Sequence, residues 1–520
     1  MPPTGSQRSP SLLSYSDTEL TPPPSFAPSL PEKCESKTEV KTFTIDVEAQ
    51  SGSENGKEQA ASTIRVSSPL IWIIEHVSLW SLEWGPFLLL VTYFVVSVFL
   101  YIVLPESVIQ VFWFFYMASN FYIAGNTVIE ACLSLTPIEQ ARKAVKKVEQ
   151  NNWVFSTNEK DLPMIDIMIV AYLPNEKDII MDRTLYAVQR IVYPMDRFRI
   201  NIVYNTPKPI PELQKQLDSL TSTYPNLCVM QVPNSKSKAD NVNYFLALDF
   251  QTDVIAIFDC DHYPHPYGPR WAAERFRQDK AVDVVQGRCV VFNAATSFLT
   301  SMIAVEFDKI YAVSHPGRAE MWQFGLFCGS NGYWKANILR QIGMDESMLT
   351  EDIDSALRAL GKNAFWKQRL RWAQGWTQAS IKHAKLAWNN PEEGNRKVCV
   401  RAGIFSLLFV RELSYYLVTQ YTCLVINFII VDFPKSPVQL ARLVFFQFPV
   451  SEWFFIISLA TLFITLAITF HVRSEFVTVS MMIKFTILYP FYLVITAAMG
   501  VYGHARQLTG YSSWNPTSRA

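Results

Sequence analysis

The stretch Val254-Ile255-Ala256-Ile257-Phe258-Asp259-Cys260-Asp261-His262 decides how the rest of the chain is interpreted. Five apolar residues run straight into Asp-Cys-Asp, and a short continuous apolar run is typical of a strand buried on both faces, as in a parallel sheet. Because residues two apart along a strand point the same way, we expect Asp259 and Asp261 to face one side and Cys260 the other.

The two carboxylates repel each other unless a cation lies between them or one of them is protonated. Ligands of open α/β sheets bind just outside the carboxyl ends of the strands, where this pair falls. Hard cations prefer carboxylate and phosphate oxygens. We therefore predict that Asp259 and Asp261 bind Mg2+ or Mn2+ together with a diphosphate, although Asp-x-Asp alone fits a solvated turn equally well.

The surrounding residues alternate strand and helix patterns, which indicates an α/β domain with a parallel, doubly wound sheet over residues 132–395. Further strands are predicted at Ile165–Tyr172, Arg199–Tyr204, Cys228–Val232 and Val282–Gln286, and helices at Ile179–Ile191, Glu212–Leu220 and from Lys236 to Leu248.

Composition favours a membrane protein. The 520 residues carry no net charge, so nothing indicates a nucleic-acid partner. Hydrophobic residues make up 49% of the chain and gather near its two ends, which indicates membrane spans on either side of a soluble part. The eight cysteines show no C-x-x-C pair, so neither a zinc site nor a disulfide framework is indicated.

The first part of the chain is predicted to be a disordered tail, residues 1–66, because it is rich in Ser, Pro, Thr, Glu and Lys. Within residues 67–131 an amphipathic stretch, Pro69–Trp80, is expected at the membrane surface. It is followed by two spans, Pro86–Leu104 and Ser107–Ile129, which form a hairpin. The basic cluster that follows the hairpin favours the cytoplasm, so we expect a multi-pass plasma-membrane protein with a cytosolic domain.

Three more spans are predicted within residues 396–504, at Gly403–Val431, Trp453–Phe470 and Phe485–Val501. The shorter run Val438–Val450 contains an arginine and is interpreted as interfacial or re-entrant. Residues 505–520 form the C-terminal tail.

Four further motifs have chemistry of interest, each with a structural alternative. Lys238 near a helix start can meet phosphate, or lie on a solvated face. The turn Phe327–Gly332 has glycines that permit close approach of a ligand, or is an ordinary loop. Thr350–Asp354 offers a carboxylate as general base, or caps a helix. Gln368–Trp372 contains arginines, which can bind a diphosphate, next to the flat face of a tryptophan. The alternative is a basic and aromatic helix that rests on lipid headgroups.

In this order and between membrane spans, the motifs resemble the membrane-embedded family 2 glycosyltransferases, the cellulose, chitin and hyaluronan synthases. The resemblance covers roughly residues 84–518 and is closest to fungal members. It implies a cytosolic GT-A domain between a helical hairpin and a transmembrane bundle. It also implies a processive inverting transferase that adds sugar from a UDP-sugar donor to a growing polysaccharide and exports the product through the lipid bilayer. A non-processive enzyme with a lipid acceptor shares these motifs.

The resemblance also implies roles for single residues. Asp352, next to Glu351, would be the catalytic base, and Asp259 and Asp261 would bind the metal. The nucleotide sugar would be held by Ala171, Tyr172, Glu176, Asn205, Lys238, Asp259, Gln368, Arg371 and Trp372, and the acceptor by Cys328, Gly329, Ser330 and Trp372.

The chain departs from the family pattern in three places. The second strand ends in Asn205, where relatives usually have an aspartate. Only 15 residues separate Asp352 from Gln368, fewer than in relatives, so an inactive relative or splice form is an alternative. The closing Trp514–Arg519 resembles a motif that lies near the cytosolic site, which requires a sixth crossing or a re-entrant element around Val438–Val450.

Overall fold

The computed structural model describes residues 69–510, apart from 249, 326, 347, 349–369, 389–397 and 449. For residues 69–83, 370–373, 375 and 376 only the helical backbone is described. The predicted disordered tail, residues 1–66, and most of the predicted C-terminal tail therefore lie outside the described residues.

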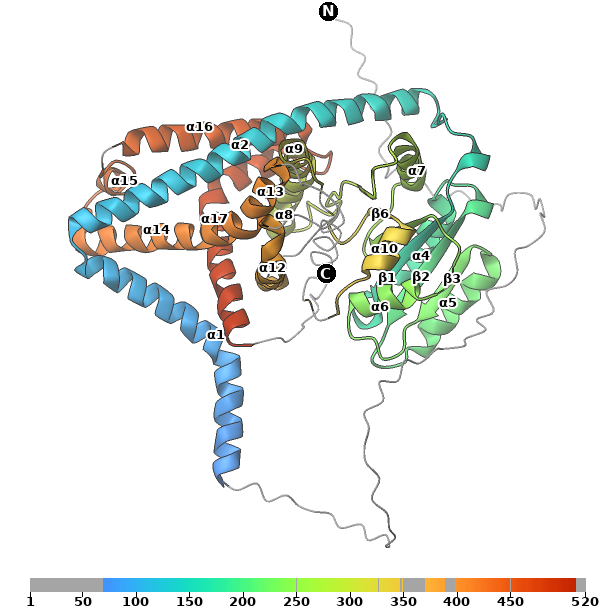
Figure 1. Cartoon of the computed structure of the whole chain (residues 1–520), viewed down its shortest axis with the longest axis horizontal. Coiled ribbons are helices and arrows are strands. Elements are labelled where there is room, and N and C mark those ends of the chain that lie inside the picture. Colours follow the sequence, from blue (N-terminus) through green and yellow to red (C-terminus); the bar gives the residue numbers. More distant parts are fainter. Residues whose placement is uncertain are drawn as a thin grey trace, which may run out of the picture. The chain divides into compact units, whose positions relative to one another are not determined.

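A six-stranded sheet forms the centre of the described soluble region, with strand order β3-β2-β1-β4-β6-β5 (Figure 1). The strands are β1 Ile165–Tyr172, β2 Phe198–Asn205, β3 Leu227–Gln231, β4 Val254–Asp259, β5 Val284–Gln286 and β6 Gly332–Lys335. Every strand expected from an apolar run is present, and the bounds of β1 agree residue for residue with the prediction.

The expectation of an all-parallel sheet is wrong in one strand. β1 to β4 pair in parallel, but β6 runs antiparallel to both β4 and β5. β6 contains only four residues and directly follows the glycine-containing turn. Four residues are too few to show a periodic pattern, so this strand is not predictable from the sequence alone.

Helices cover both faces of the sheet, as a doubly wound fold requires. Side chains of β1 alternate between the two sides: Ile165, Ile167 and Ile169 join one apolar core, and Met168 and Val170 join the other. The first core is shared with α4 Ile180–Arg190, α5 Pro211–Thr223 and α7 Gly268–Gln278, and the second with α6 Lys238–Leu246 and α10 Ala336–Ile342.

Five described segments are long and apolar enough to cross a membrane, namely Trp84–Val103, Glu106–Gln150, Val398–Asp432, Ser451–Val472 and Val479–Leu508. They belong to α1 Pro69–Val103, α2 Glu106–Gln150, α13 Val398–Phe405 with α14 Arg411–Asp432, α16 Ser451–Val472 and α17 Val479–Leu508. Four of them contain a predicted span, and Trp84–Val103 contains all of the fifth, Pro86–Leu104, except its last residue. The stretch expected at the membrane surface, Pro69–Trp80, is helical and forms the first part of α1, and its position at the surface stays a prediction.

A sixth crossing around Val438–Val450 is excluded by length. The segment forms α15 Pro437–Phe445, nine residues that measure about 13 Å at 1.5 Å per residue. A span needs about 20 residues.

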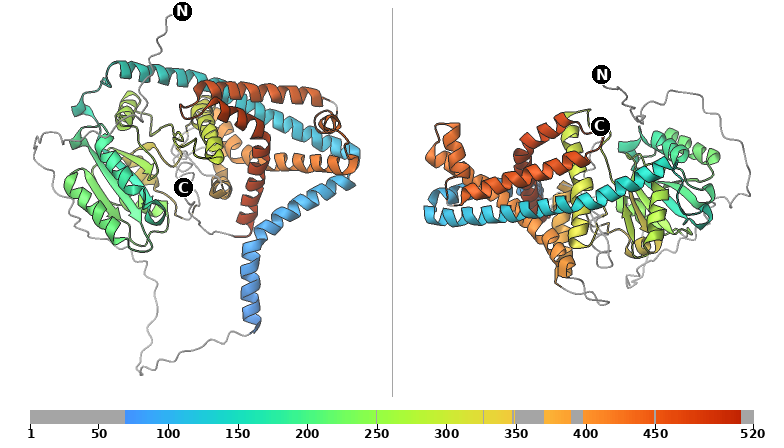
Figure 2. Two further views of the ribbon diagram at one scale, coloured as in Figure 1. Left: turned by 180° about the vertical axis from the view of Figure 1, so that it is seen from behind. Right: turned by 90° about the horizontal axis from the view of Figure 1, so that it is seen from above.

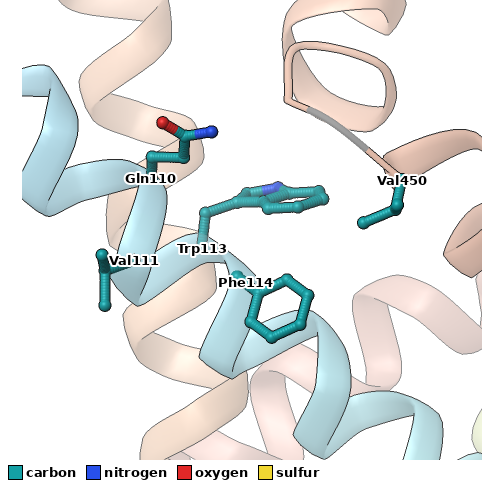
Figure 3. A pocket seen from close by; sticks show the side chains of 5 residues that line it. All are labelled: Gln110, Val111, Trp113, Phe114 and Val450. Carbon is teal, nitrogen blue, oxygen red and sulfur yellow. The ribbon is translucent and has the colours of Figure 1, made fainter.

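An apolar hollow of about 330 Å³ lies beside the segment Val438–Val450, lined by Gln110, Val111, Trp113, Phe114 and Val450. Figure 3 shows the ring of Trp113 extending from α2 toward Val450. The apolar lining of this hollow is unsuited to a charged nucleotide.

The remaining described elements connect the sheet and the long helices. They are η1 Glu159–Asp161, α3 Leu173–Glu176, η2 Met195–Arg197, α8 Phe298–Lys309, η3 Ile310–Ser314, α9 His315–Trp322, α12 Leu370–His383, η4 Ala384–Ala387 and η5 Ser406–Val410.

Helix α2 packs against α16 and α9, and the two views in Figure 2 also show α2 and α16 side by side. The contact with α9 is so close that a Cβ on Gly317 would lie 1.7 Å from the carbonyl oxygen of Glu130. Arg318 pairs with the carboxylate of Glu130 at 3.2 Å. Glycine at position 317 therefore sets how near the two helices approach.

Candidate functional site

The centre of the site is a cluster of three side chains directly after β4. Ligand atoms of Asp259, Asp261 and His262 all lie within 4.8 Å of one another, while Cys260 is buried. The predicted side-by-side placement of the two aspartates is consistent with this geometry. Two carboxylates and an imidazole together suit Mn2+, and the carboxylate oxygens alone suit Mg2+. His262 was not selected from the sequence, although it adjoins the motif and imidazole is a common metal ligand.

The imidazole of His262 carries a proton in this arrangement. Burial lowers its pKa, but the hydrogen bond to Cys289 and the charges of Asp261 and Asp259 outweigh burial and raise the pKa to about 9. Nε2 lies 3.9 Å from the Asp261 carboxylate. The imidazole therefore places positive charge beside the Asp261 carboxylate, and binding of a metal ion to this ring would release the proton.

Lys238 reaches the same cluster from α6. It is the first residue of the helix, after Ser237, whose side chain caps the helix in a capping box with Asp240. Its ammonium donates to Oδ1 of Asp259 at 2.5 Å and to the carbonyl oxygen of Gly329 at 2.7 Å. The alternative of a purely solvated lysine is thus wrong, because the side chain points into the site. A helix N-terminus with a lysine favours an anion.

The segment Cys328–Ser330, the acceptor-side loop of the resemblance, packs against the end of β4. The hydroxyl oxygen of Ser330 accepts a hydrogen bond from the backbone N–H of Asp259 at 2.9 Å and lies 3.0 Å from Nδ1 of His262. Gly329 has φ +77°, the left-handed region that favours glycine. The loop is therefore built to approach β4 closely.

Gln286, at the end of β5, holds this loop from the other side. Its Oε1 accepts from the backbone N–H of Cys328 at 2.8 Å, and its Nε2 donates to the carbonyl oxygens of Ser330 and Asn331 at 2.9 and 3.1 Å. Sequence reasoning missed Gln286, because a glutamine at a strand end has no motif and its partners lie more than forty residues away.

The remaining described residues assigned to the nucleotide sugar lie at the carboxyl ends of β1 and β2. Buried Glu176 accepts from the backbone N–H of Tyr172 at 2.7 Å, which shapes the turn into α3. Asn205 accepts from Nδ2 of Asn241 at 2.9 Å and donates to the carbonyl oxygen of Ser235 at 3.1 Å. An ionised aspartate could not make the second bond, which gives a physical reason for asparagine here.

Asn241 also connects this group to β1, because its Nδ2 lies 3.5 Å from the carbonyl oxygen of Ala171. The ends of β1 and β2 and the start of α6 are thereby joined around one edge of the sheet. Five assigned residues are not placed by these contacts. Glu351, Asp352 and Gln368 lie outside the described residues, and Arg371 and Trp372 lie in α12 with only their backbone described.

The relatives found by sequence are glycosyltransferases. No family model matches the chain. It is 25% identical over 254 residues to the probable glycosyltransferase YdaM of Bacillus subtilis, over 44% of this chain and 58% of that protein. It is also 25% identical over 205 residues to the probable glucomannan 4-beta-mannosyltransferase 7 of Oryza sativa subsp. japonica, and over 247 residues to the cellulose synthase catalytic subunit of Pseudomonas fluorescens.

The last two matches cover 38% and 43% of this chain but only 34% and 32% of the relatives' own length. Among solved structures, the mannosyltransferase PcManGT from Pyrobaculum calidifontis in complex with GDP-Man and Mn2+ has a TM-score of 0.40 at 14% identity, over 68% of this chain and 99% of that one. S. aureus TarS 1-349 in complex with UDP-GlcNAc has a TM-score of 0.32 at 13% identity, over 57% of this chain and 88% of that one. The expected closeness to fungal synthases stays a prediction.

Proposed function

We propose that the chain is a processive, inverting family 2 glycosyltransferase that transfers sugar from a UDP-sugar to a growing polysaccharide and exports the product across the plasma membrane. The observation that carries the proposal is the gathering of Asp259, Asp261 and His262 at the carboxyl end of β4, beside Lys238 at the start of α6. The relatives found by sequence, which are glycosyltransferases, support the same reaction class.

In this proposal the diphosphate binds at the edge of the sheet where β4 ends. Asp259 and Asp261, with His262, would hold Mg2+ or Mn2+, which supplies positive charge to stabilise the departing diphosphate. Lys238 leaves the Asp259 carboxylate to donate to a phosphate oxygen, and the N-terminus of α6 favours the same negative charge.

The transfer itself is a displacement at the anomeric carbon. The acceptor hydroxyl oxygen forms a bond to the anomeric carbon while the bond between that carbon and the diphosphate oxygen breaks. The hydroxyl proton passes to Asp352 as general base. The loop that contains Ser330, held by Gln286, would bind the acceptor end, and Arg371 and Trp372 would hold the diphosphate and the sugar ring.

Export is supported by polar contacts between the apolar helices. Gln420 of α14 donates to the hydroxyl of Ser97 in α1 at 2.8 Å and accepts from the hydroxyl of Tyr101 at 2.9 Å. The Tyr101 and Tyr116 hydroxyls lie 2.7 Å apart. Polar side chains within a membrane bundle are costly and often mark the path of a polar substrate.

The test uses the full chain in lipid nanodiscs with Mn2+ and a panel of UDP-sugars, with GDP-mannose included because of the mannosyltransferase relatives. We expect release of UDP from one donor and a long polymer on a sizing gel. A single-sugar lipid product would reject the polymer in favour of the lipid-acceptor alternative. Binding of UDP without any release would favour the inactive form suggested by the short interval before Gln368.

Variants then test the residues. Asp259→Asn and Asp261→Asn should each lower UDP release by about 100-fold or more, because a metal ligand loses its charge. Asp196→Asn is the matched control, since its side chain is 79% exposed in η2. UDP release at the rate of the unaltered chain by both Asp259→Asn and Asp261→Asn would overturn the metal assignment. UDP release that persists in Asp352→Asn would refute the proposed base.

A further inference from the structure

Helix α12, which carries Arg371 and Trp372, packs against α17 and η5. Polar contacts on one face of α12 connect it to these neighbours. Gln374, which is buried, and Gln378, which is half-buried one turn later, both donate from Nε2 to Oε1 of Gln507 in α17, at 3.4 and 3.1 Å. Residues four apart lie on the same side of a helix, so this face of α12 is registered against α17.

Glu412, the second residue of α14, joins α12 to two other helices. Its carboxylate accepts from Nε2 of His504 in α17 at 2.5 Å and is paired with Arg411. The hydroxyls of Thr377 and Ser380 in α12 lie 3.5 Å from the two carboxylate oxygens. The same carboxylate therefore contacts α12, α14 and α17.

His504 is itself held by Tyr416, one turn after Glu412. The Tyr416 hydroxyl lies 2.7 Å from Nδ1 of His504, and the two rings stack with centroids 5.4 Å apart. An ionised carboxylate only accepts, so Nε2 of His504 carries the proton that bonds Glu412, and Nδ1 accepts from Tyr416. Both ring nitrogens of His504 are thereby in use, and its orientation is determined.

Local backbone geometry places Glu412 in this position. The π-helical turn η5 Ser406–Val410 ends immediately before Arg411. A π-helical turn shifts the register of the residues that follow it, and such turns are frequent at functional sites. The buried ion pair of Glu412 is with Arg411. Such a pair adds little stability compared with apolar residues of the same size, so stability alone is a weak reason for a carboxylate at position 412.

We infer that Glu412 and His504 are positioning residues that anchor α12 and thereby set where Arg371 and Trp372 meet the acceptor and the diphosphate. Trp372 precedes Thr377 by five residues, about 7.5 Å along a rigid helix axis. A shift of α12 at Thr377 is therefore carried to the proposed site. The inference rests on the proposed transferase function and adds to it a link between the site and the membrane helices.

The test compares Glu412→Leu, Glu412→Gln and His504→Leu in the full chain in nanodiscs. A misplacement of about 1 Å costs about 100-fold in rate, so we expect Glu412→Leu and His504→Leu to lower kcat for UDP release by about that factor. KM for the UDP-sugar should rise by a smaller factor than kcat falls, because Arg371 and Trp372 are displaced while Asp259 and Lys238 still bind the diphosphate. Glu412→Gln keeps an acceptor oxygen and should recover most of the rate.

Thr422→Val is the control, because Thr422 lies on α14 and, among the described residues, its hydroxyl bonds to the carbonyl oxygen of Val418 within that helix. It should retain the rate of the unaltered chain. A loss of rate with a parallel rise in KM, no loss at all, or a loss that Glu412→Gln fails to recover would each overturn the inference.

A second measurement separates this inference from the proposed function. Amide hydrogen exchange in α12 should be faster in Glu412→Leu than in the unaltered chain, whether or not the chain is active. Faster exchange in a chain that releases no UDP would uphold the anchor and count against the transferase. Unchanged exchange in α12 would overturn the anchor itself.

Discussion

Replacing Lys238 by methionine removes one positive charge from the candidate site and keeps an unbranched side chain of similar length. In the structure, the ammonium donates to Asp259 at 2.5 Å and to the carbonyl oxygen of Gly329 at 2.7 Å. The proposed mechanism requires it to exchange Asp259 for a phosphate oxygen when the nucleotide binds. The Lys238→Met change should therefore act in opposite directions on nucleotide and on metal.

The magnitudes follow from these contacts. A hydrogen bond to a charged partner contributes about 1.5–3 kcal/mol, so UDP should bind about 10- to 150-fold more weakly in the presence of saturating Mn2+. Without nucleotide, Lys238 competes with a cation for Asp259. Two unit charges about 4 Å apart repel by about 1 kcal/mol even at the dielectric constant of water, so Mn2+ alone should bind at least about fivefold more tightly.

Titration calorimetry measures UDP binding, and the paramagnetic resonance signal of free Mn2+ measures metal binding. Lys236→Met is the control, since Lys236 is exposed two residues earlier and its loss changes the net charge equally. An exposed charge is screened by salt, so we expect both affinities to stay within about twofold. Unchanged UDP binding in Lys238→Met, or equal effects of both variants, would refute the phosphate role of Lys238.

Three further substitutions test the supporting structure. Gln286→Leu should lower the rate of UDP release about tenfold or more, because it frees the loop that Gln286 holds, while the affinity for UDP stays nearly unchanged. A fall in UDP affinity without a fall in rate would contradict this role. Arg199→Met removes two bonds, at 2.7 and 2.8 Å, from the fully buried Asp166 carboxylate and leaves it the bond from Asn201 at 3.2 Å. This should cost about 3 kcal/mol of unfolding free energy, seen in denaturant unfolding and partly recovered by adding Asp166→Asn. Gly317→Ala should lower the thermal midpoint through a cost of about 1–3 kcal/mol, because its Cβ meets the Glu130 carbonyl oxygen; an unchanged midpoint would show that α9 and α2 separate freely.

Much of the sheet was predictable because its strands are continuous apolar runs. β1 and β4 are buried on both faces, so each contains almost only apolar residues before its polar end. The placement of Asp259 and Asp261 on one side follows from the period of two in a strand, which is local geometry. The apolar membrane helices were predictable for a similar reason, since bilayer thickness dictates their length.

The partners of the site residues were not predictable in this way. Asn205 donates from its side-chain amide to the carbonyl oxygen of Ser235, and Gln286 holds a loop that is distant in sequence. The strand β6 becomes visible only when its four residues pair with β4. Glu412 and His504 are separated by more than ninety residues and meet only in the assembled helices.

Short runs of residues specify the buried strands, the membrane-length helices and the direction of neighbouring side chains within a strand, so these features follow from the order of the amino acids. Which polar groups meet depends on the folded arrangement, including the contact of Lys238 with Asp259 and the anchor at Glu412. The physical reason is that strand and helix geometry repeats along the chain, whereas a hydrogen bond between distant segments depends on how every intervening element packs.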